Sequence, residues 1–148
     1  MYLLGTLAVL GIVTLTSCKK EDPKPIAGVI TKIVFYDWID PDEADDSGPD
    51  VYFTIEDANG NTIYNLGSDN RIPDVEDIFY WSNLNIELNL TTKFYVRLWD
   101  YDPLDYDDDM GACGGITLNT YANMENPPEY IDISCDNMDY RIYVTWKY

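Results

Sequence analysis

Residues 51–61 read Val-Tyr-Phe-Thr-Ile-Glu-Asp-Ala-Asn-Gly-Asn, and this stretch decides the fold class of the chain. Val51, Phe53 and Ile55 alternate with Tyr, Thr and Glu, which is the period of a strand with one buried face. The Asn59-Gly60 pair that follows is a strong short-range signal for a β-hairpin turn. We therefore expect a strand, a tight turn and a second strand around 62–66.

The same period of two recurs on both sides of this hairpin, and the sequence shows no convincing long amphipathic helix. Further strands are expected over residues 29–35, 84–90, 94–99, 115–118, 130–134 and 140–148. The strands 84–90 and 94–99 are expected to be neighbours. Seven or eight short strands with turn residues between them predict an all-β chain, folded as one antiparallel β-sandwich.

The charge and composition of the 148 residues exclude several classes of function. Against 27 acidic side chains there are 9 basic ones and no histidine, a net charge of −18. This charge repels phosphate backbones, so we expect no nucleic-acid partner. Without histidine, imidazole-based catalysis and His-containing zinc sites are excluded. Any partner ion is therefore a cation, and any chemistry depends on carboxylates.

The N-terminal segment is typical of an exported protein. Residues 1–17 carry no charge, and the apolar run over residues 3–15 is too short for a bilayer core of about 30 Å, which favours a signal peptide at 1–17. The sequence Leu15-Thr16-Ser17-Cys18 resembles the lipobox of bacterial lipoproteins, which implies that Cys18 becomes the lipidated first residue. Residues 18–26 then form a polar linker, and 27–148 form the domain. The run Cys18-Lys19-Lys20-Glu21-Asp22 resembles the acidic surface-export signal of some lipoproteins, so we expect an outer-membrane lipid anchor with surface exposure.

Two further cysteines lie in the domain, Cys113 and Cys135. An exported chain lies outside the reducing cytosol, so these two residues are able to form a disulfide. Two separate thiols in the core are the alternative. Their spacing matches no zinc motif.

The acidic residues are concentrated in two segments that hold no basic residue, 37–50 and 100–109. Together these segments contain 13 of the 27 acidic residues; the other residues carry 14 acidic and 9 basic side chains, a net of −5. Both segments are expected in loops, where like charges repel unless a cation is shared. Calcium takes roughly six to eight oxygen ligands, which aspartate-rich loops supply. The alternative is that these acids only keep the protein soluble.

The second acidic segment carries a family resemblance. The stretch Leu98-Trp99-Asp100-Tyr101-Asp102, followed by Asp108 and Gly111, resembles the third calcium-binding loop of C2 domains. Upstream, the segment Gly48-Pro49-Asp50-Val51 is similar to the one in which a family aspartate opens a strand. An EF-hand is not an option, because no register from Asp100 or Asp105 places both the glycine and the final glutamate.

The C2 resemblance covers residues 28–148 and implies a fold and a ligand set. The implied fold is an eight-stranded antiparallel Greek-key β-sandwich. The implied Ca²⁺ ligands are Asp50, Asp100, Asp102 and Asp108, with Asp45 as a fifth and Asp42 or Asp46 as its substitutes.

These observations together predict a calcium-binding, lipid-anchored C2-like binding module on the bacterial envelope surface, and not an enzyme. Its expected partners are the membrane, through the N-terminal lipid, and a surface protein or a glycan. A metal-free adhesin or structural β-sandwich with solubilising acidic loops is the alternative. A carboxylate-dependent glycan hydrolase is a third reading, with the least support.

Overall fold

The computed structural model describes residues 22–39, 48–104 and 106–148. Within these ranges the chain forms eight strands and two very short helices. The strands are β1 (Ala27–Trp38), β2 (Val51–Asp57), β3 (Thr62–Asn65), β4 (Phe79–Asn89), β5 (Phe94–Asp100), β6 (Asp108–Ile116), β7 (Tyr130–Cys135) and β8 (Met138–Lys147). The helices are η1 (Ser68–Asn70) and α1 (Asn119–Ala122).

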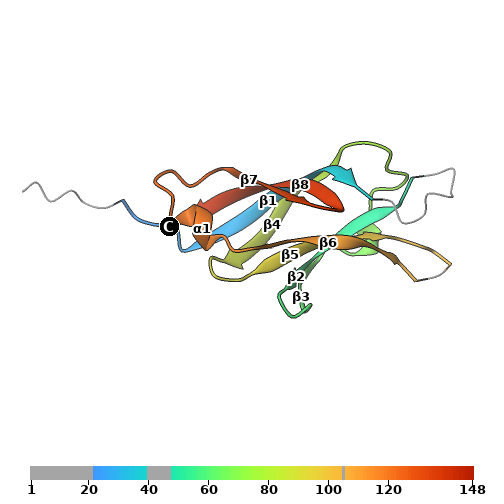
Figure 1. Cartoon of the computed structure of the whole chain (residues 1–148), viewed down its shortest axis with the longest axis horizontal. Helices are drawn as coiled ribbons and strands as arrows, with labels where there is room; N and C mark the ends of the chain where they lie inside the picture. The colour runs from blue at the N-terminus through green and yellow to red at the C-terminus, as the bar shows by residue number, and fades with distance from the viewer. Residues whose placement is uncertain (1–21, 40–47, 105) are drawn as a thin grey trace, which may run out of the picture.

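The strands form two antiparallel four-stranded sheets, with the orders β4-β1-β8-β7 and β3-β2-β5-β6. The sheets pack face to face (Figure 1). The chain crosses between the sheets several times. It leaves the first sheet after β1, returns to it at β4, and leaves it again for β5 before β7 and β8 complete it. This arrangement confirms the prediction of an eight-stranded antiparallel Greek-key β-sandwich.

Aromatic side chains from both sheets fill the core at its centre. The ring of Phe35 stacks on Phe79 at 5.1 Å and on Tyr140 at 5.3 Å, and Phe53 of the opposite sheet lies 5.0 Å from Trp81. Phe35, Phe53 and Tyr140 are fully buried. The Tyr140 hydroxyl donates a 3.0 Å hydrogen bond to the carbonyl of Cys113, so burying it leaves no polar group unpaired.

The expected pairing of β4 with β5 is wrong. β4 pairs with β1, whereas β5 pairs with β2 and β6 in the other sheet. Each strand has a single apolar face, and residues 90–93 connect them across the edge of the sandwich. A link of this length serves equally as a hairpin or as a crossover, so local sequence did not distinguish the two.

β6 begins seven residues earlier than the strand predicted over 115–118. Its sequence, Asp-Asp-Met-Gly-Ala-Cys-Gly-Gly-Ile, shows no clear alternation, and its register with β5 shifts twice. Gly111 adopts a φ of 106°, and glycine accepts such an angle with little strain. Asp108 and Asp109, which were assigned to the loop, are therefore strand residues.

A disulfide joins Cys113 of β6 to Cys135 of β7. These are edge strands of the two different sheets, so the bond links the sheets along one side of the sandwich. The described residues contain no helix long and apolar enough to cross a membrane.

The sandwich has two ends of different character. At one end Trp38 pairs with Met138, and at the other end Ala27 pairs with Lys147. Of the described acidic residues, Asp37, Asp50 and Asp100 lie at the Trp38 end, while the entry to β1, α1 and the C-terminus lie at the opposite end (Figure 1). At about 3.3 Å per residue, the 12 residues of β1 place these ends about 36 Å apart.

Candidate functional site

Three of the expected ligands lie on neighbouring strands at the acidic end. Asp50 directly precedes β2, Asp100 ends β5 and Asp108 begins β6. In the sheet register, Val51 is opposite Asp100, and Asp100 is opposite Asp108. The described parts of the two acidic segments therefore meet at one edge of one sheet.

Backbone hydrogen bonds hold this meeting point together. The N–H of Asp50 donates to Oδ1 of Asp100 over 2.8 Å, and the N–H of Tyr101 donates to the carbonyl of Asp50 over 2.9 Å. Asp100 is only 9% exposed, and its carboxylate caps the start of β2. A hydrogen bond to an ionised acceptor is stronger than one between neutral groups, so this contact fixes the two segments relative to each other.

The carboxylate of Asp50 has protein partners of its own. Its Oδ2 accepts a 2.9 Å ion-paired hydrogen bond from Nε of Arg71, and its Oδ1 accepts a 3.1 Å bond from the N–H of Asp74. The guanidinium of Arg71 also lies over the ring of Tyr101, 4.3 Å from the centroid. Asp50 is thus neutralised by a cation from the β3–β4 connection.

Sequence reasoning missed Arg71, which is separated from Asp50 by 21 residues. The connection folds back because the N–H of Val51 donates to the carbonyl of Ile72 and the N–H of Ile72 donates to the carbonyl of Val51. Arg71 is the lone basic residue between β3 and β4, where several acids are closer to it in sequence, so the sequence gave no signal that Asp50 is its partner. Only the tertiary path places it beside the acidic end.

Asp107 and Asp109, two acids outside the ligand set that the C2 resemblance implies, are bonded to other side chains. The Tyr52 hydroxyl donates a 2.6 Å hydrogen bond to Asp107, and burial together with this carboxylate raises the pKa of Tyr52. Arg97 bonds Glu56 through Nε and contacts Asp109 through Nη1. Asp107 and Asp109 are therefore structural partners of the β2–β5–β6 face.

The donor set was tested for its fit to Ca²⁺. Among the residues that the structure describes, no group of three or more acidic or cysteine side chains is already arranged to hold a metal ion. Asp102 and Asp108 are half-buried at the strand end where Asp100 lies. All three supply carboxylate oxygens, the ligand type that Ca²⁺ takes. These carboxylate oxygens therefore fit Ca²⁺ in their chemistry. Asp50 is able to offer both of its oxygens to the ion only if Arg71 and the N–H of Asp74 release them.

Four of the sequence-predicted residues lie outside the described parts of the chain, namely the predicted fifth ligand Asp45, its substitutes Asp42 and Asp46, and the predicted lipidation residue Cys18. The predicted signal peptide, residues 1–17, lies outside as well.

No protein-family model matches this chain, and comparison with characterised proteins finds no match either. The class of protein is therefore defined by the fold alone: it is an antiparallel β-sandwich with acidic residues at one end of its strands. The C2 resemblance stays a prediction based on the motif spacing.

Proposed function

We propose that this protein is a calcium-binding, lipid-anchored β-sandwich that works as a binding module on the bacterial envelope surface. The observation that supports this most is the 2.8 Å hydrogen bond between Asp50 and Asp100, because it brings two strongly acidic segments to one place. Together these segments carry 13 of the 27 acidic residues and no basic residue.

Calcium relieves the repulsion among these carboxylates. Asp100, Asp102 and Asp108 form the ligand set at the end of β5 and the start of β6, and Asp50 borders it from β2. Arg71 offsets one negative charge there, which leaves a net negative strand end. A shared divalent cation stabilises the folded state because it binds the assembled carboxylates and not the unfolded chain.

The position of the acidic end favours an external ligand. The lipid on Cys18 precedes the end where β1 begins, and the acidic end lies about 36 Å farther along the sandwich. This separation exceeds several Debye lengths of about 8 Å at physiological salt. The calcium site therefore faces away from the anchoring membrane and is presented to a surface protein or a glycan.

Melting curves test the calcium site directly. Millimolar Ca²⁺ is expected to raise the melting temperature by about 4 °C relative to EDTA, the shift that about 1 kcal/mol produces in a domain of about 120 residues. The variant Asp102→Asn/Asp108→Asn loses this shift. A matched control, Asp22→Asn/Glu125→Gln, removes two exposed acids at the opposite end and retains it. Identical curves with Ca²⁺ and EDTA overturn the proposal.

A metal-free adhesin or structural β-sandwich is the second candidate. It is favoured by the protein partners of the acids: Arg71 holds Asp50, Arg97 contacts Asp109, and Tyr52 bonds Asp107. If these partners suffice, neither Ca²⁺ nor EDTA changes the melting temperature, and the acidic end serves solubility.

A further inference from the structure

Three large exposed side chains lie at the end of the sandwich opposite Asp50 and Asp100. Ile26 is 70% exposed, Met124 48% and Tyr148 62%. The N–H of Ile26 donates a 2.7 Å hydrogen bond to the carbonyl of Lys147, which places Ile26 beside the C-terminal residue. Met124 and Tyr148 line one cavity. Ile26, Met124 and Tyr148 together form what we call the basal patch, because they lie at the end where the chain enters the domain.

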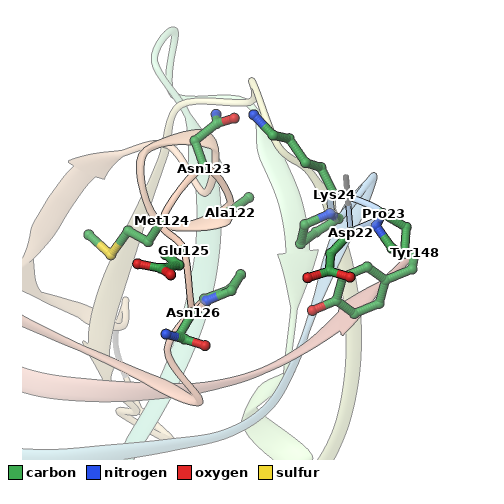
Figure 2. Close-up of a pocket in the computed structure, with 11 residues that line it drawn as sticks. Asp22, Pro23, Lys24, Ala122, Asn123, Met124, Glu125, Asn126 and Tyr148 are labelled. Carbon is green, nitrogen blue, oxygen red and sulfur yellow. The ribbon is translucent and has the colours of Figure 1, made fainter. Parts of the chain in front are cut away.

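The cavity at this end lies between the linker and the segment that follows α1. Asp22, Pro23, Lys24 and Tyr148 lie on one side of it, and Asn123 to Asn126 lie on the other (Figure 2). Pro25 is buried, and the backbone bond of Ile26 follows directly. The linker is therefore fixed to the domain before β1 begins, and the basal patch lies next to the point where the chain enters.

The length of the linker limits the distance between this end and a lipidated Cys18. Asp22 is four residue steps beyond Cys18, and even a fully extended chain spans at most about 14 Å over that length. Such a short connection holds the base of the domain against the headgroup region of the bilayer. It also gives the patch a high effective concentration of lipid, so weak apolar contacts are enough for occupancy.

The chemistry of the patch suits a membrane interface. Ile26 and Met124 are apolar, and Tyr148 combines an apolar ring with a hydroxyl, the property that concentrates tyrosine at membrane–water interfaces. Lys24 lines the adjoining cavity together with the carboxylates of Asp22 and Glu125, so lipid binding at this end depends on the apolar contacts more than on charge. Most of the excess negative charge lies at the far end, where salt screens it from anionic lipid.

We propose that the basal patch docks on the bilayer to which the chain is anchored, so that the domain stands upright and presents its acidic end outward. The proposal rests on the lipid anchor of the proposed function. It adds a second contact, made by Ile26, Met124 and Tyr148, that sets the orientation of the domain.

The experiment uses the lipidated full chain in vesicles of phosphatidylethanolamine and phosphatidylglycerol with nitroxide-labelled lipid. An environment-sensitive fluorophore is attached through Met124→Cys or Asn123→Cys at the base, and through Leu104→Cys, 99% exposed beside the acidic residues, as the matched control. The native Cys113–Cys135 disulfide and the lipidated Cys18 leave the new thiol for labelling. Melting curves check that each variant is folded.

We expect nitroxide quenching to be several-fold stronger for labels at positions 123 and 124 than for the label at position 104. The double substitution Ile26→Gln/Tyr148→Gln should reduce the quenching at positions 123 and 124, while the protein still floats with the vesicles. Equal or absent quenching at the two ends, in protein that floats with the vesicles, overturns the docking proposal and leaves the lipid anchor standing. Protein that does not float with the vesicles overturns the anchor itself, and the docking proposal with it.

Discussion

The N–H of Asp50 donates to the carboxylate of Asp100 across 2.8 Å, while the carbonyl of Asp50 accepts from the N–H of Tyr101 across 2.9 Å. These two bonds tie the entry of β2 to the exit of β5. One backbone–side-chain bond and one backbone–backbone bond therefore bring Asp50 and Asp100 together. A cation that binds there still has to draw Asp102 and Asp108 toward this pair, because no three acidic side chains in the described residues are arranged to hold a metal ion.

Arg71 should compete with calcium for Asp50. In EDTA, Arg71→Gln is expected to lose about 1 kcal/mol of unfolding free energy, because it removes a partly exposed ion pair and the stacking on Tyr101. In millimolar Ca²⁺ the deficit should shrink, since both oxygens of Asp50 become available to the ion. Urea denaturation with and without Ca²⁺ measures both values.

Arg141→Gln is the matched control for this variant. Arg141 pairs with Asp132 on β7 and β8 and lies over the ring of Tyr130, so it combines the same two interactions elsewhere. Its deficit should be the same in Ca²⁺ and in EDTA. If Arg71→Gln behaves like this control, Arg71 and calcium do not share Asp50.

Alanine substitutions at two glycines with positive φ, Gly60 and Gly111, distinguish the cost of backbone strain from the cost of side-chain crowding. At Gly60, with φ of 81°, an added Cβ meets nothing within 4 Å, so Gly60→Ala should cost only the strain of about 1–2 kcal/mol. At Gly111, with φ of 106°, the added Cβ would lie 1.7 Å from Nδ2 of Asn137, which donates to the carbonyl of Met110. Gly111→Ala should therefore cost about 1 kcal/mol more in urea denaturation; equal costs would show that Asn137 moves aside freely.

The Cys113–Cys135 disulfide should contribute substantially to stability. It closes a loop with a sequence separation of 22 and joins the edges of the two sheets. The loop-entropy relation gives about 3 kcal/mol for such a closure. Cys113→Ala/Cys135→Ala should lose this amount in equilibrium denaturation, and the parent protein under reducing conditions should lose a similar amount. Unchanged midpoints in both experiments would contradict a stabilising role.

The β2–β3 turn should contribute to acid sensitivity through Asp57. The side-chain amide of Asn61, followed by the N–H groups of Asn61 and Asn59, holds the pKa of Asp57 below its usual 3.8. This stabilisation is present above the unfolded-state pKa and is lost as the pH falls through the lower folded-state pKa. Asp57→Asn should therefore lose less stability on acidification below pH 3.8.

Melting temperature measured against pH tests the Asp57 prediction. Asn61→Ala removes the side-chain hydrogen bond that lowers the pKa of Asp57 most. The melting temperature of this variant should therefore also fall less steeply as the pH is lowered. Curves parallel to that of the parent protein for both variants would contradict the assignment.

Much of the fold was predictable because several strands bury one regular face. The alternation over 51–56 and 94–99 matches β2 and β5 to within one residue at each end. β6 was not predictable in the same way, since its three glycines and two acids replace the alternation that a strand normally shows. The partner of β4 depends on a crossover between sheets, which local sequence does not specify.

The candidate site was predictable in its position but not in its contacts. Acidic residues at the ends of β5 and β6 share a strand end because those strands pair, and Asp50 joins them because β2 pairs with β5. The bond from Arg71 to Asp50 could not be foreseen, because it depends on how the β3–β4 connection folds back.

Calorimetric titration of Ca²⁺ into the full-length protein is the direct test of calcium binding at the acidic end. Saturable binding heat is expected for the parent protein, and no such heat for an Asp102→Asn/Asp108→Asn variant that retains its fold. If the folded parent protein gives no calcium-linked heat, the calcium site does not exist and the protein is a metal-free β-sandwich.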